Sequence, residues 1–473
     1  MNYTDAVRYL LALGGELAAP RQPARVAKFD LRNITTVAAK LGSPHRAVPC
    51  AHIAGTNGKG STAAMLESIL RQAGLKTGLY TSPHLERINE RIAVNGQPIS
   101  DDDFASAFNR VHNAIEALLA SGELTAHPTF FECVTAMAFD YFACAKLDFA
   151  VYEVGMGGRL DSTNIVAPEV CVITQIDFDH ENYLGHSIEQ IAGEKAGILK
   201  PGVPVVCAAG RPEARAVIAR RAAALGCPVV DIETEYRVEP CHSEATPAAA
   251  GDAGGNVAEE SQGLTRFKVS GKGDSAPATI AVPLPGRFQL RNAVTALAAA
   301  RILCQRGFNI SDDDLAAGIA QTRWPGRLEL VSRSPDVYLD GTHNPAGARE
   351  LLAFWDEQLH GRRILLIFGA VRDKAIEEIT GLLFPRAAQV ICTQPRSARA
   401  ISAKRLAELT AHDAGNLEVI AEPEAALARA LDLAQPDDVV FATGSLYLVG
   451  DLRRWWRTQH PSVIPSEAAH RKV

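Results

Sequence analysis

The residues that bear most directly on chemistry lie in one short segment, which reads Gly55, Thr56, Asn57, Gly58, Lys59, Gly60, Ser61, Thr62. Glycines let a backbone turn until successive N–H groups point inward, and the start of a helix adds partial positive charge. A lysine and hydroxyl groups beside such a turn favour phosphate. An apolar segment precedes these residues and an Ala- and Leu-rich one follows, so we predict a strand, a phosphate-binding loop and a helix.

The spacing of this loop departs from the common phosphate-loop pattern, which has four residues between its first two glycines and a hydroxyl directly after the lysine. Here only Thr56 and Asn57 separate the first two glycines, and Gly60 follows the lysine. A glycine-rich turn before an ordinary helix is the alternative. The strand and helix on either side favour phosphate binding.

Two more side chains follow apolar segments that read as neighbouring strands. Glu153 ends the first, and a carboxylate there is costly unless it is paired or binds a cation. It could hold magnesium on nucleotide phosphates, and an ion pair with Arg159 is the alternative. His180 follows the second strand at the same end. Lys195 lies on an expected helix, where the pattern alone favours a solvated lysine.

A second polar cluster lies nearer the C-terminus, where a strand over residues 337–339 runs into a turn and then a helix with Pro345 at its first position. Asp340 stands at the carboxyl end of that strand, where open α/β sheets collect ligands. We favour a binding role for Asp340 and His343. For Asn344, a helix cap and a site role stay equally open.

Alternating strands and helices must position these residues. The almost wholly apolar segments 149–154 and 170–174 suit a parallel sheet covered by helices on both faces. Residues 240–278 are rich in Ala, Gly, Ser and Glu, which predicts a partly flexible surface excursion with a β-ribbon at 265–269. After a Pro-Gly pair at 325–326, a smaller parallel sheet is expected, with strands at 337–339, 363–368, 389–393, 417–420 and 439–442.

Composition limits the class of protein. A length of 473 residues allows two or three domains, and we predict domains at 1–322 and 323–473. A net charge of −6 argues against a nucleic-acid partner. The nine cysteines form no CxxC pair, which argues against a zinc cluster or a disulfide framework. No signal-peptide pattern or long apolar run is present, so we expect a cytoplasmic protein without membrane contact. We also expect a monomer with small-molecule partners.

Five motifs, in this order, resemble the folylpolyglutamate synthase and dihydrofolate synthase family of the Mur ligase superfamily. They are AGTNGKGS at 54–61, TSPHL at 81–85, EVGMGGRLD at 153–161, EKAG at 194–197 and DGTHNP at 340–345. The resemblance runs from the N-terminal helices to residue 448, apart from the excursion. It implies an α/β fold: an N-terminal P-loop ATPase domain with a mostly parallel sheet flanked by helices, and a smaller C-terminal Rossmann-like domain.

The resemblance also implies ATP-dependent amide formation. The carboxylate of dihydropteroate or a folate attacks the γ-phosphate, and the amine of L-glutamate then displaces phosphate from the acyl phosphate. Two anions can meet only where positive charge neutralises them, here Lys59, the loop N–H groups and magnesium. By resemblance we favour an enzyme that both makes dihydrofolate and extends polyglutamate tails.

Individual roles follow from the same resemblance. Magnesium ligands fall on Ser82, Glu153 and His180, and Lys195 matches a lysine that is carbamylated in many members and holds a second magnesium. These ligands, apart from Ser82, form the catalytic set with Lys59. Contacts to ATP fall on the phosphate loop and on Asn292, Arg327, Asp340 and His343. Substrate positions are Phe29, Asp30, Thr129, Phe130, Phe131, Glu132, Leu160, Asp161 and Ser162. Asp177 makes the segment before His180 more acidic than is usual in the family.

Two other functions remain as alternatives. A Mur-type ligase would add an amino acid to a cell-wall nucleotide precursor, and the segment at 129–132 argues against it. A non-ligase P-loop NTPase would have no need of the motif at 340–345.

Overall fold

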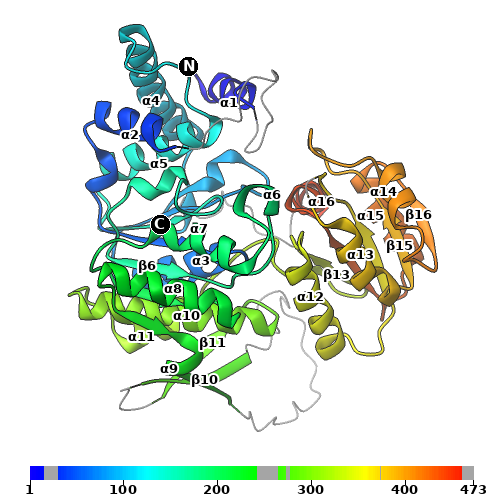
Figure 1. The fold of residues 1–473 in the computed structure, drawn as a ribbon. Coiled ribbons are helices and arrows are strands. Elements are labelled where there is room, and N and C mark those ends of the chain that lie inside the picture. The colour runs from blue at the N-terminus through cyan, green and yellow to red at the C-terminus, as the bar shows by residue number, and fades with distance from the viewer. Residues whose placement is uncertain (15–29, 242–264, 273–276, 373, 461–473) are drawn as a thin grey trace, which may run out of the picture. The chain divides into compact units, whose positions relative to one another are not determined.

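The computed structural model describes residues 1–14, 30–241, 265–272, 277–372 and 374–460. Phe29 and most of the expected excursion at 240–278 therefore lie outside the described residues. The chain divides into two compact units, Met1–Ile232 with Thr295–Asp314, and Glu233–Val294 with Leu315–Val473. Figure 1 shows that each unit contains a sheet with helices packed on it.

The first unit is built on an eight-stranded sheet in the order β4-β3-β2-β5-β1-β6-β7-β8. The six strands from β2 to β8 in that order are parallel, while β3 and β4 add an antiparallel edge. The strands are β1 Cys50–Ala54, β2 Thr77–Tyr80, β3 Ile92–Val94, β4 Gln97–Pro98, β5 Phe149–Glu153, β6 Val170–Ile173, β7 Val205–Cys207 and β8 Val229–Asp231. The strands β1, β5 and β6 are buried at every residue, as their apolar sequences predict.

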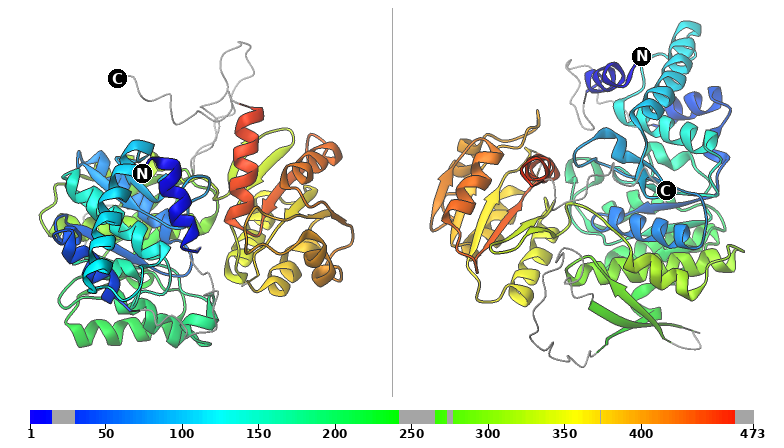
Figure 2. Two further views of the ribbon diagram at one scale, coloured as in Figure 1. Left: turned by 90° about the horizontal axis from the view of Figure 1, so that it is seen from above. Right: turned by 180° about the vertical axis from the view of Figure 1, so that it is seen from behind.

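Helices cover this sheet, and two apolar clusters form its core. One cluster joins the sheet to α1, α2, α4 and α5, and the other joins it to α7 and α8. Figure 2 shows α1, in dark blue, beside α4. The helices are α1 Tyr3–Ala12, α2 Arg32–Lys40, α3 Lys59–Gln72, α4 Asp101–Ser121, α5 Phe130–Cys144, α6 Glu181–Leu184, α7 Ile188–Lys195 and α8 Pro212–Leu225. Three helices, α9 Ile232–Glu235, α10 Arg287–Gln305 and α11 Asp312–Ala320, have residues in both units.

The second unit contains two sheets. A three-stranded antiparallel sheet has the order β11-β10-β9, and its strand β10 confirms the predicted ribbon. A six-stranded sheet has the order β12-β13-β17-β14-β15-β16. The strands are β9 Tyr236–Pro240, β10 Thr265–Gly271, β11 Ala278–Val282, β12 Glu329–Ser332, β13 Asp336–Leu339, β14 Ile364–Phe368, β15 Gln389–Cys392, β16 Leu417–Val419 and β17 Val439–Thr443.

The six-stranded sheet differs from the expected parallel sheet at one edge. Strand β12 is antiparallel to β13, because the connection between them is too short for a parallel crossover. The other strands are parallel, as predicted. The helices of this unit are α12 Pro345–Gln358, α13 Ile376–Leu383, α14 Ala403–Thr410, α15 Pro423–Leu433 and α16 Leu446–Gln459.

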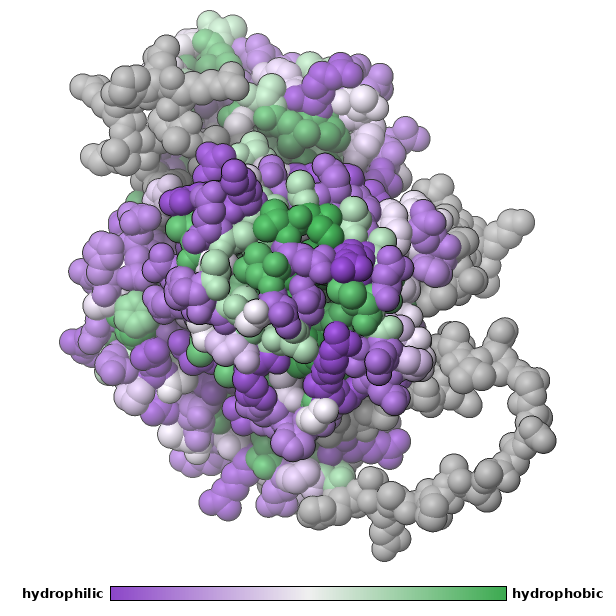
Figure 3. All heavy atoms as spheres, turned by 90° about the vertical axis from the view of Figure 1, so that its right-hand side faces the viewer, coloured by the Kyte–Doolittle hydropathy of each residue, from purple (hydrophilic) through white to green (hydrophobic). Residues whose placement is uncertain are grey.

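The surface seen in Figure 3 is mixed, with hydrophilic residues around a group of hydrophobic ones. Within the described part of the chain, no helix combines the length and the apolar character needed to cross a membrane.

Candidate active site

The phosphate-binding loop connects β1 to α3, and its glycines are required by its shape. Gly58 precedes α3 with φ 85°, a conformation that glycine adopts without strain. A Cβ on Gly55 would overlap Oγ1 of Thr174. The loop is held by the residues that directly follow β6: the backbone N–H of Thr56 donates to the Gln175 carbonyl at 2.7 Å, and Thr174 Oγ1 donates to the Asn57 carbonyl at 2.8 Å.

The side chains of the loop and of the first turn of α3 differ in exposure. Asn57, Lys59 and Gly60 are half-buried, and Lys59 Nζ donates to the Thr56 carbonyl at 3.1 Å. Ser61 is buried. Thr62 is wholly buried, and its Oγ1 has no hydrogen-bond partner among the described residues. Because the first N–H groups of a helix have no partner within it, the open turn at Lys59 and Gly60 is the part of this segment best suited to an anion.

Lys195 lies beneath this loop, so the expectation of a solvated lysine is wrong. Its side chain is only 4% exposed, and Nζ donates to the Gly55 carbonyl at 2.7 Å. Burial, and next the charge of Lys59, lower the pKa of Lys195 from 10.5 to about 7, although Asp179 and Asp161 act in the opposite direction. Burial therefore favours the unprotonated form of this amine.

Glu153 ends β5 as a buried carboxylate, 4% exposed. Its Oε2 accepts the backbone N–H of Ser82 at 3.0 Å, which joins the ends of the neighbouring strands β5 and β2. Arg159, the partner considered for Glu153 from sequence, pairs with Glu194 at 2.9 Å. The oxygen atoms of Ser82 and Glu153 therefore lie on adjacent segments at one end of the sheet.

His180 follows β6 and precedes α6, with a left-handed φ of 52°. Its Nε2 lies 3.8 Å from the Asp179 carboxylate. The unusual Asp177 nearby is held by other groups: Arg211 Nη2 and the backbone N–H of Phe178 each donate to its Oδ1 at 2.9 Å. Its backbone also exchanges hydrogen bonds with Thr56 Oγ1. These contacts make Asp177 a brace between the loops after β1 and β6.

We predict that Arg211→Gln lowers the free energy of unfolding by about 1 kcal/mol, because a partly buried ion pair is lost. The magnesium dependence of activity should stay within about twofold of wild type. Urea denaturation and a magnesium titration measure the two quantities, and Arg211→Lys is the charge-preserving control. A large rise in the magnesium requirement would mean that Asp177 belongs with the metal-binding groups.

The loop after β5 packs tightly against the end of α7. A Cβ on Gly158 would lie 2.9 Å from the carbonyl oxygens of Glu194 and Lys195, and a Cβ on Gly197 would overlap the Arg159 backbone. Side chains at these two positions would push the loop away from Lys195. The two glycines therefore let the EVGMGGRLD and EKAG segments meet.

Gly158→Ala is accordingly expected to lower the free energy of unfolding by about 1–3 kcal/mol, since the backbone atoms that it meets cannot move aside cheaply. Gly193→Ala is the matched control. Gly193 lies on α7, and a Cβ there meets nothing within 4 Å, so this change should stabilise by up to about 1 kcal/mol. Equal effects of the two substitutions in urea denaturation would contradict the packing argument.

The segment at 129–132 begins α5 with a structural motif that sequence analysis missed. Thr129 N donates to Glu132 Oε2 at 2.7 Å and Glu132 N donates to Thr129 Oγ1 at 3.2 Å, which is a capping box. The threonine and glutamate spacing was the available signal. Phe130 is buried under the Arg91 guanidinium. The half-buried Phe131 ring lies against Gly155, where a Cβ would overlap it.

The other expected substrate residues fall into two places. Asp30, which precedes α2, forms an ion pair with Arg32. Burial raises the pKa of the Glu132 carboxyl, and the nearby charge of Asp30 raises it further. Asp161 and Ser162 are buried and Leu160 is half-buried. The carboxylate of Asp161 accepts N–H groups of Met156 and Thr163 at 3.0 Å. The structure thus gives Asp161 a bracing role within its own loop.

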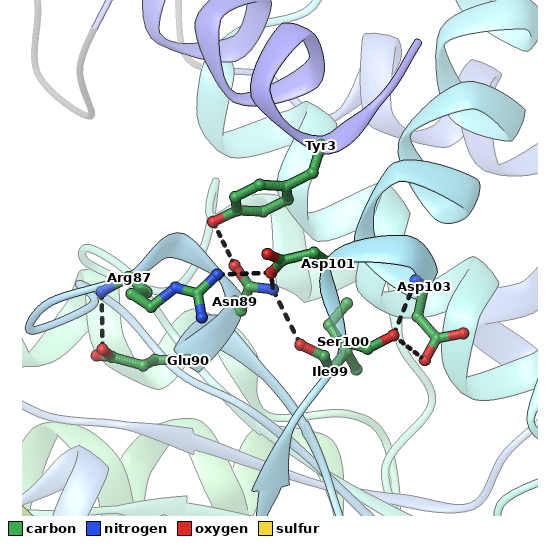
Figure 4. A network of polar contacts seen from close by, with 8 residues as sticks. All are labelled: Tyr3, Arg87, Asn89, Glu90, Ile99, Ser100, Asp101 and Asp103. Carbon is green, nitrogen blue, oxygen red and sulfur yellow. Dashed lines mark hydrogen bonds and ion pairs between the residues drawn. The ribbon is translucent and has the colours of Figure 1, made fainter. Parts of the chain in front are cut away.

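Sequence reasoning also missed the contacts that hold the loop at 82–91, which carries Ser82. Figure 4 shows Asn89 at the centre of this network. It accepts from the Tyr3 hydroxyl at 2.6 Å and donates to Asp101 at 3.1 Å, while Arg87 also reaches Asp101. Glu90 accepts the backbone N–H of Arg87 at 2.7 Å. Polar residues scattered along a chain carry no periodic signal, so nothing in the sequence pointed to this network.

In the second unit, three of the expected nucleotide residues gather around Gly341. Asp340 Oδ2 accepts the Leu328 N–H and Oδ1 accepts the Thr342 N–H, both at 2.9 Å. A Cβ on Gly341 would overlap the Arg327 guanidinium, and His343 Nδ1 donates to the Gly341 carbonyl at 2.8 Å.

Two further polar side chains, Asn344 and Asn292, have structural partners. Asn344 caps α12 by accepting the Gly347 N–H at 2.8 Å, so the helix cap, one of the two roles considered from sequence, is present. Asn292 lies on α10 and donates to Gln289 Oε1 at 2.9 Å.

The donors available for magnesium are few. Among the residues that the structure describes, no three or more His, Cys, Asp or Glu side chains form a group able to hold a metal ion. Magnesium is usually held by one or two carboxylates together with substrate phosphates and water. The Glu153 carboxylate and the Ser82 hydroxyl, on segments joined by a hydrogen bond, are donors of that kind.

Comparisons with known proteins agree with this arrangement. Residues 53–300 match the Mur ligase middle domain and residues 326–446 match the Mur ligase, glutamate ligase domain. The chain is 37% identical to the Bacillus subtilis dihydrofolate synthase/folylpolyglutamate synthase, over 90% of this chain and 95% of that protein. The Escherichia coli FolC structure in complex with DHPP and ADP has a TM-score of 0.81 at 30% identity, over 97% of this chain and 99% of that one.

A Mycobacterium tuberculosis folylpolyglutamate synthase, complexed with ADP and AMPPCP, also has a TM-score of 0.81, at 32% identity over 90% of this chain and 95% of that one. Fold and matches together define a Mur-type, ATP-dependent ligase. Within that class, the chain belongs to the dihydrofolate synthase/folylpolyglutamate synthase family.

Proposed function

We propose that this protein uses ATP to join L-glutamate to dihydropteroate and to folates, releasing ADP and phosphate. The observation that carries the proposal is the convergence of the phosphate loop, Ser82, Glu153 and His180 on the carboxyl ends of four adjacent strands, β2, β5, β1 and β6. Family membership gives this arrangement its substrates. The E. coli relative was solved with DHPP and ADP, ligands of the kind proposed here.

The reaction has two steps. A carboxylate oxygen of the pteroate or folate bonds to the γ-phosphorus as the bond to ADP breaks, which gives an acyl phosphate. The glutamate nitrogen then bonds to the acyl carbon, phosphate leaves, and the amine gives up a proton. The loop N–H groups and Lys59 bind the phosphates and reduce the repulsion between the two anions.

Magnesium, held by Ser82, Glu153 and His180, would supply further positive charge at the phosphates. We assign Lys195 a carbamate. Its unprotonated amine takes up CO₂ and releases one proton, which turns a neutral buried amine into an anion able to hold a second magnesium. Two features support this assignment: the burial of Lys195 beneath the loop, and its pKa of about 7. Lys59, Glu153, His180 and Lys195 are then the catalytic groups.

The remaining site residues belong to the same proposal. Asn292, Arg327, Asp340 and His343 contact ATP, and residues 1–322 and 323–473 act as an ATP-binding domain and a ligase domain. The pterin lies near Asp30, Thr129–Glu132 and 160–162, where the Phe131 ring against Gly155 suits stacking with a flat heterocycle. The enzyme works as a cytoplasmic monomer.

The test is an assay of ADP release with ATP, magnesium, L-glutamate and one acceptor, either dihydropteroate or tetrahydrofolate. ADP release that needs both glutamate and an acceptor is expected, with a product heavier by one glutamyl residue in mass spectrometry. The two acceptors separate dihydrofolate formation from polyglutamate extension. ATP hydrolysis without either acid would favour an NTPase, and activity with only a uridine nucleotide-linked acceptor would favour a cell-wall ligase.

A further inference from the structure

A line of hydrogen bonds runs from the middle of β1 to the loop after β5. His52 Nε2 lies 2.8 Å from Thr163 Oγ1, and Thr163 Oγ1 lies 2.5 Å from Asp161 Oδ1. His52 and Thr163 are both completely buried, and Asp161 is nearly so. His52 is three residues before the phosphate loop, and Asp161 ends the EVGMGGRLD motif. The contact therefore connects two motifs that are far apart in the sequence.

The direction of the hydrogen bonds follows from the groups involved. An ionised Asp161 only accepts, so the single hydroxyl proton of Thr163 points to Asp161. Thr163 Oγ1 must then accept from His52, which places the His52 proton on Nε2. In this tautomer Nδ1 of His52 is an acceptor, and it has no hydrogen-bond partner among the described residues.

His52 is fixed as a neutral ring. Burial, and next the charge of Lys200, lower the pKa of His52 from 6.5 to about 3. A buried polar atom without a hydrogen-bond partner lowers the stability of the folded state, and Nδ1 of His52 is such an atom. A leucine or valine would fill this interior position of β1 without that cost, so the donor on Nε2 is the property that histidine adds.

Asp161 is in turn hydrogen-bonded to the loop that precedes it. Its carboxylate also accepts the N–H of Met156 at 3.0 Å, and the backbone of Gly155 hydrogen-bonds to it as well. These two residues directly follow Glu153 and Val154. The same loop rests on the Lys195 carbonyl through Gly158 and on Phe131 through Gly155.

We propose that His52 and Thr163 are positioning residues, which orient the Asp161 carboxylate and thereby fix the loop at 155–161, beside which the pterin is proposed to bind. This inference rests on the proposed function, because it takes the acceptor to be bound beside that loop. Neither residue touches the substrates. Both act through Asp161.

The test compares Thr163→Val, which removes the hydroxyl at nearly constant size, with Thr163→Ser, which keeps it. Thr163→Val is expected to raise the KM for dihydropteroate about tenfold and to leave the KM for ATP within about twofold, since a hydrogen bond to a charged group is lost. Thr163→Ser should restore the KM for dihydropteroate to within about threefold of wild type. His52→Leu should show the same split as Thr163→Val, so either variant that folds suffices.

The matched control is Thr410→Val in the second unit. Thr410 is also fully buried, and its hydroxyl donates to the Leu406 carbonyl at 2.9 Å. It should lose stability without any selective change in KM. The proposal is overturned if Thr163→Val and Thr410→Val affect the two KM values alike, or if Thr163→Ser behaves like Thr163→Val. An inactive wild-type enzyme would instead refute the proposed function.

Discussion

Lys195→Ala should lower kcat by about 100-fold or more while the KM for ATP changes far less. Its amine is buried beneath the phosphate loop and bonded to the Gly55 carbonyl, and its pKa lies close to neutral. If the amine carries a carbamate, the alanine variant loses an anion close to the reacting phosphates, and losses of about 100-fold or more are usual for such groups. Initial rates at saturating ATP and acceptor measure the effect.

Rescue by small acids separates a carbamate from a lysine that acts as a cation. Added acetate or formate should restore part of the activity of Lys195→Ala, because either can supply a carboxylate in the vacated space, while added methylammonium should not. Wild-type activity should also fall in CO₂-free buffer and recover with bicarbonate. Full activity of Lys195→Ala, or rescue by methylammonium alone, would overturn the carbamate assignment.

The pH dependence of Lys195 has a definite sign. A lysine whose pKa is about 7 when folded and 10.5 when unfolded binds fewer protons in the folded state between those values. In CO₂-free buffer its contribution to the free energy of unfolding therefore rises with pH from about 7 to 10.5, and it is least favourable below pH 7. Lys195→Met should accordingly exceed wild type in stability below pH 7, with the difference shrinking as pH rises.

Glu153→Gln is the second substitution with a large expected effect. The amide has the size of the carboxylate and can still accept the Ser82 N–H, but it carries no charge for a cation. We expect kcat to fall by about 100-fold or more and the magnesium concentration for half-maximal rate to rise about tenfold. A magnesium titration at fixed ATP measures both values.

Glu67→Gln provides the matched control for Glu153→Gln. Glu67 is another buried carboxylate of the first unit, but its partners are the Thr77 hydroxyl and Arg71. Its substitution should lower stability and leave the magnesium titration unchanged. If both variants shift the titration equally, or neither does, Glu153 is not a magnesium ligand.

The strands and helices that position the site were accessible from sequence because their signals are local. The apolar segments at 149–154 and 170–174 became β5 and β6. The loop at Gly55 was recognisable as a phosphate-binding loop because its glycines and lysine lie close together, directly before a helix. Strand β12 was missed, since its pairing depends on a short turn and not on its own sequence pattern.

The contacts of individual side chains were much less accessible. Lys195 looked like a solvated helix residue, because nothing within its own helix shows that Gly55, 140 positions away, lies against it. Asp161 and Asp340 were expected beside the pterin and ATP, and the structure adds contacts that the sequence did not predict, because their carboxylates accept backbone N–H groups of nearby loops. The partner of a polar side chain depends on the packing of residues far apart in the chain, and the local pattern of a single sequence does not reveal it.

The strand order of the first sheet also determines when the site can form during folding. The phosphate loop follows β1, but β1 pairs with β5 and β6. The residues of these two strands that pair with β1 lie 100 residues or more further along the chain, as Ala150 does from Cys50. Closing such long loops is entropically costly and slows folding. A growing or truncated chain that ends before β6 thus has the lysine and glycines of the loop without the strands that shape it, and nucleotide binding should appear late in refolding, together with the completed sheet.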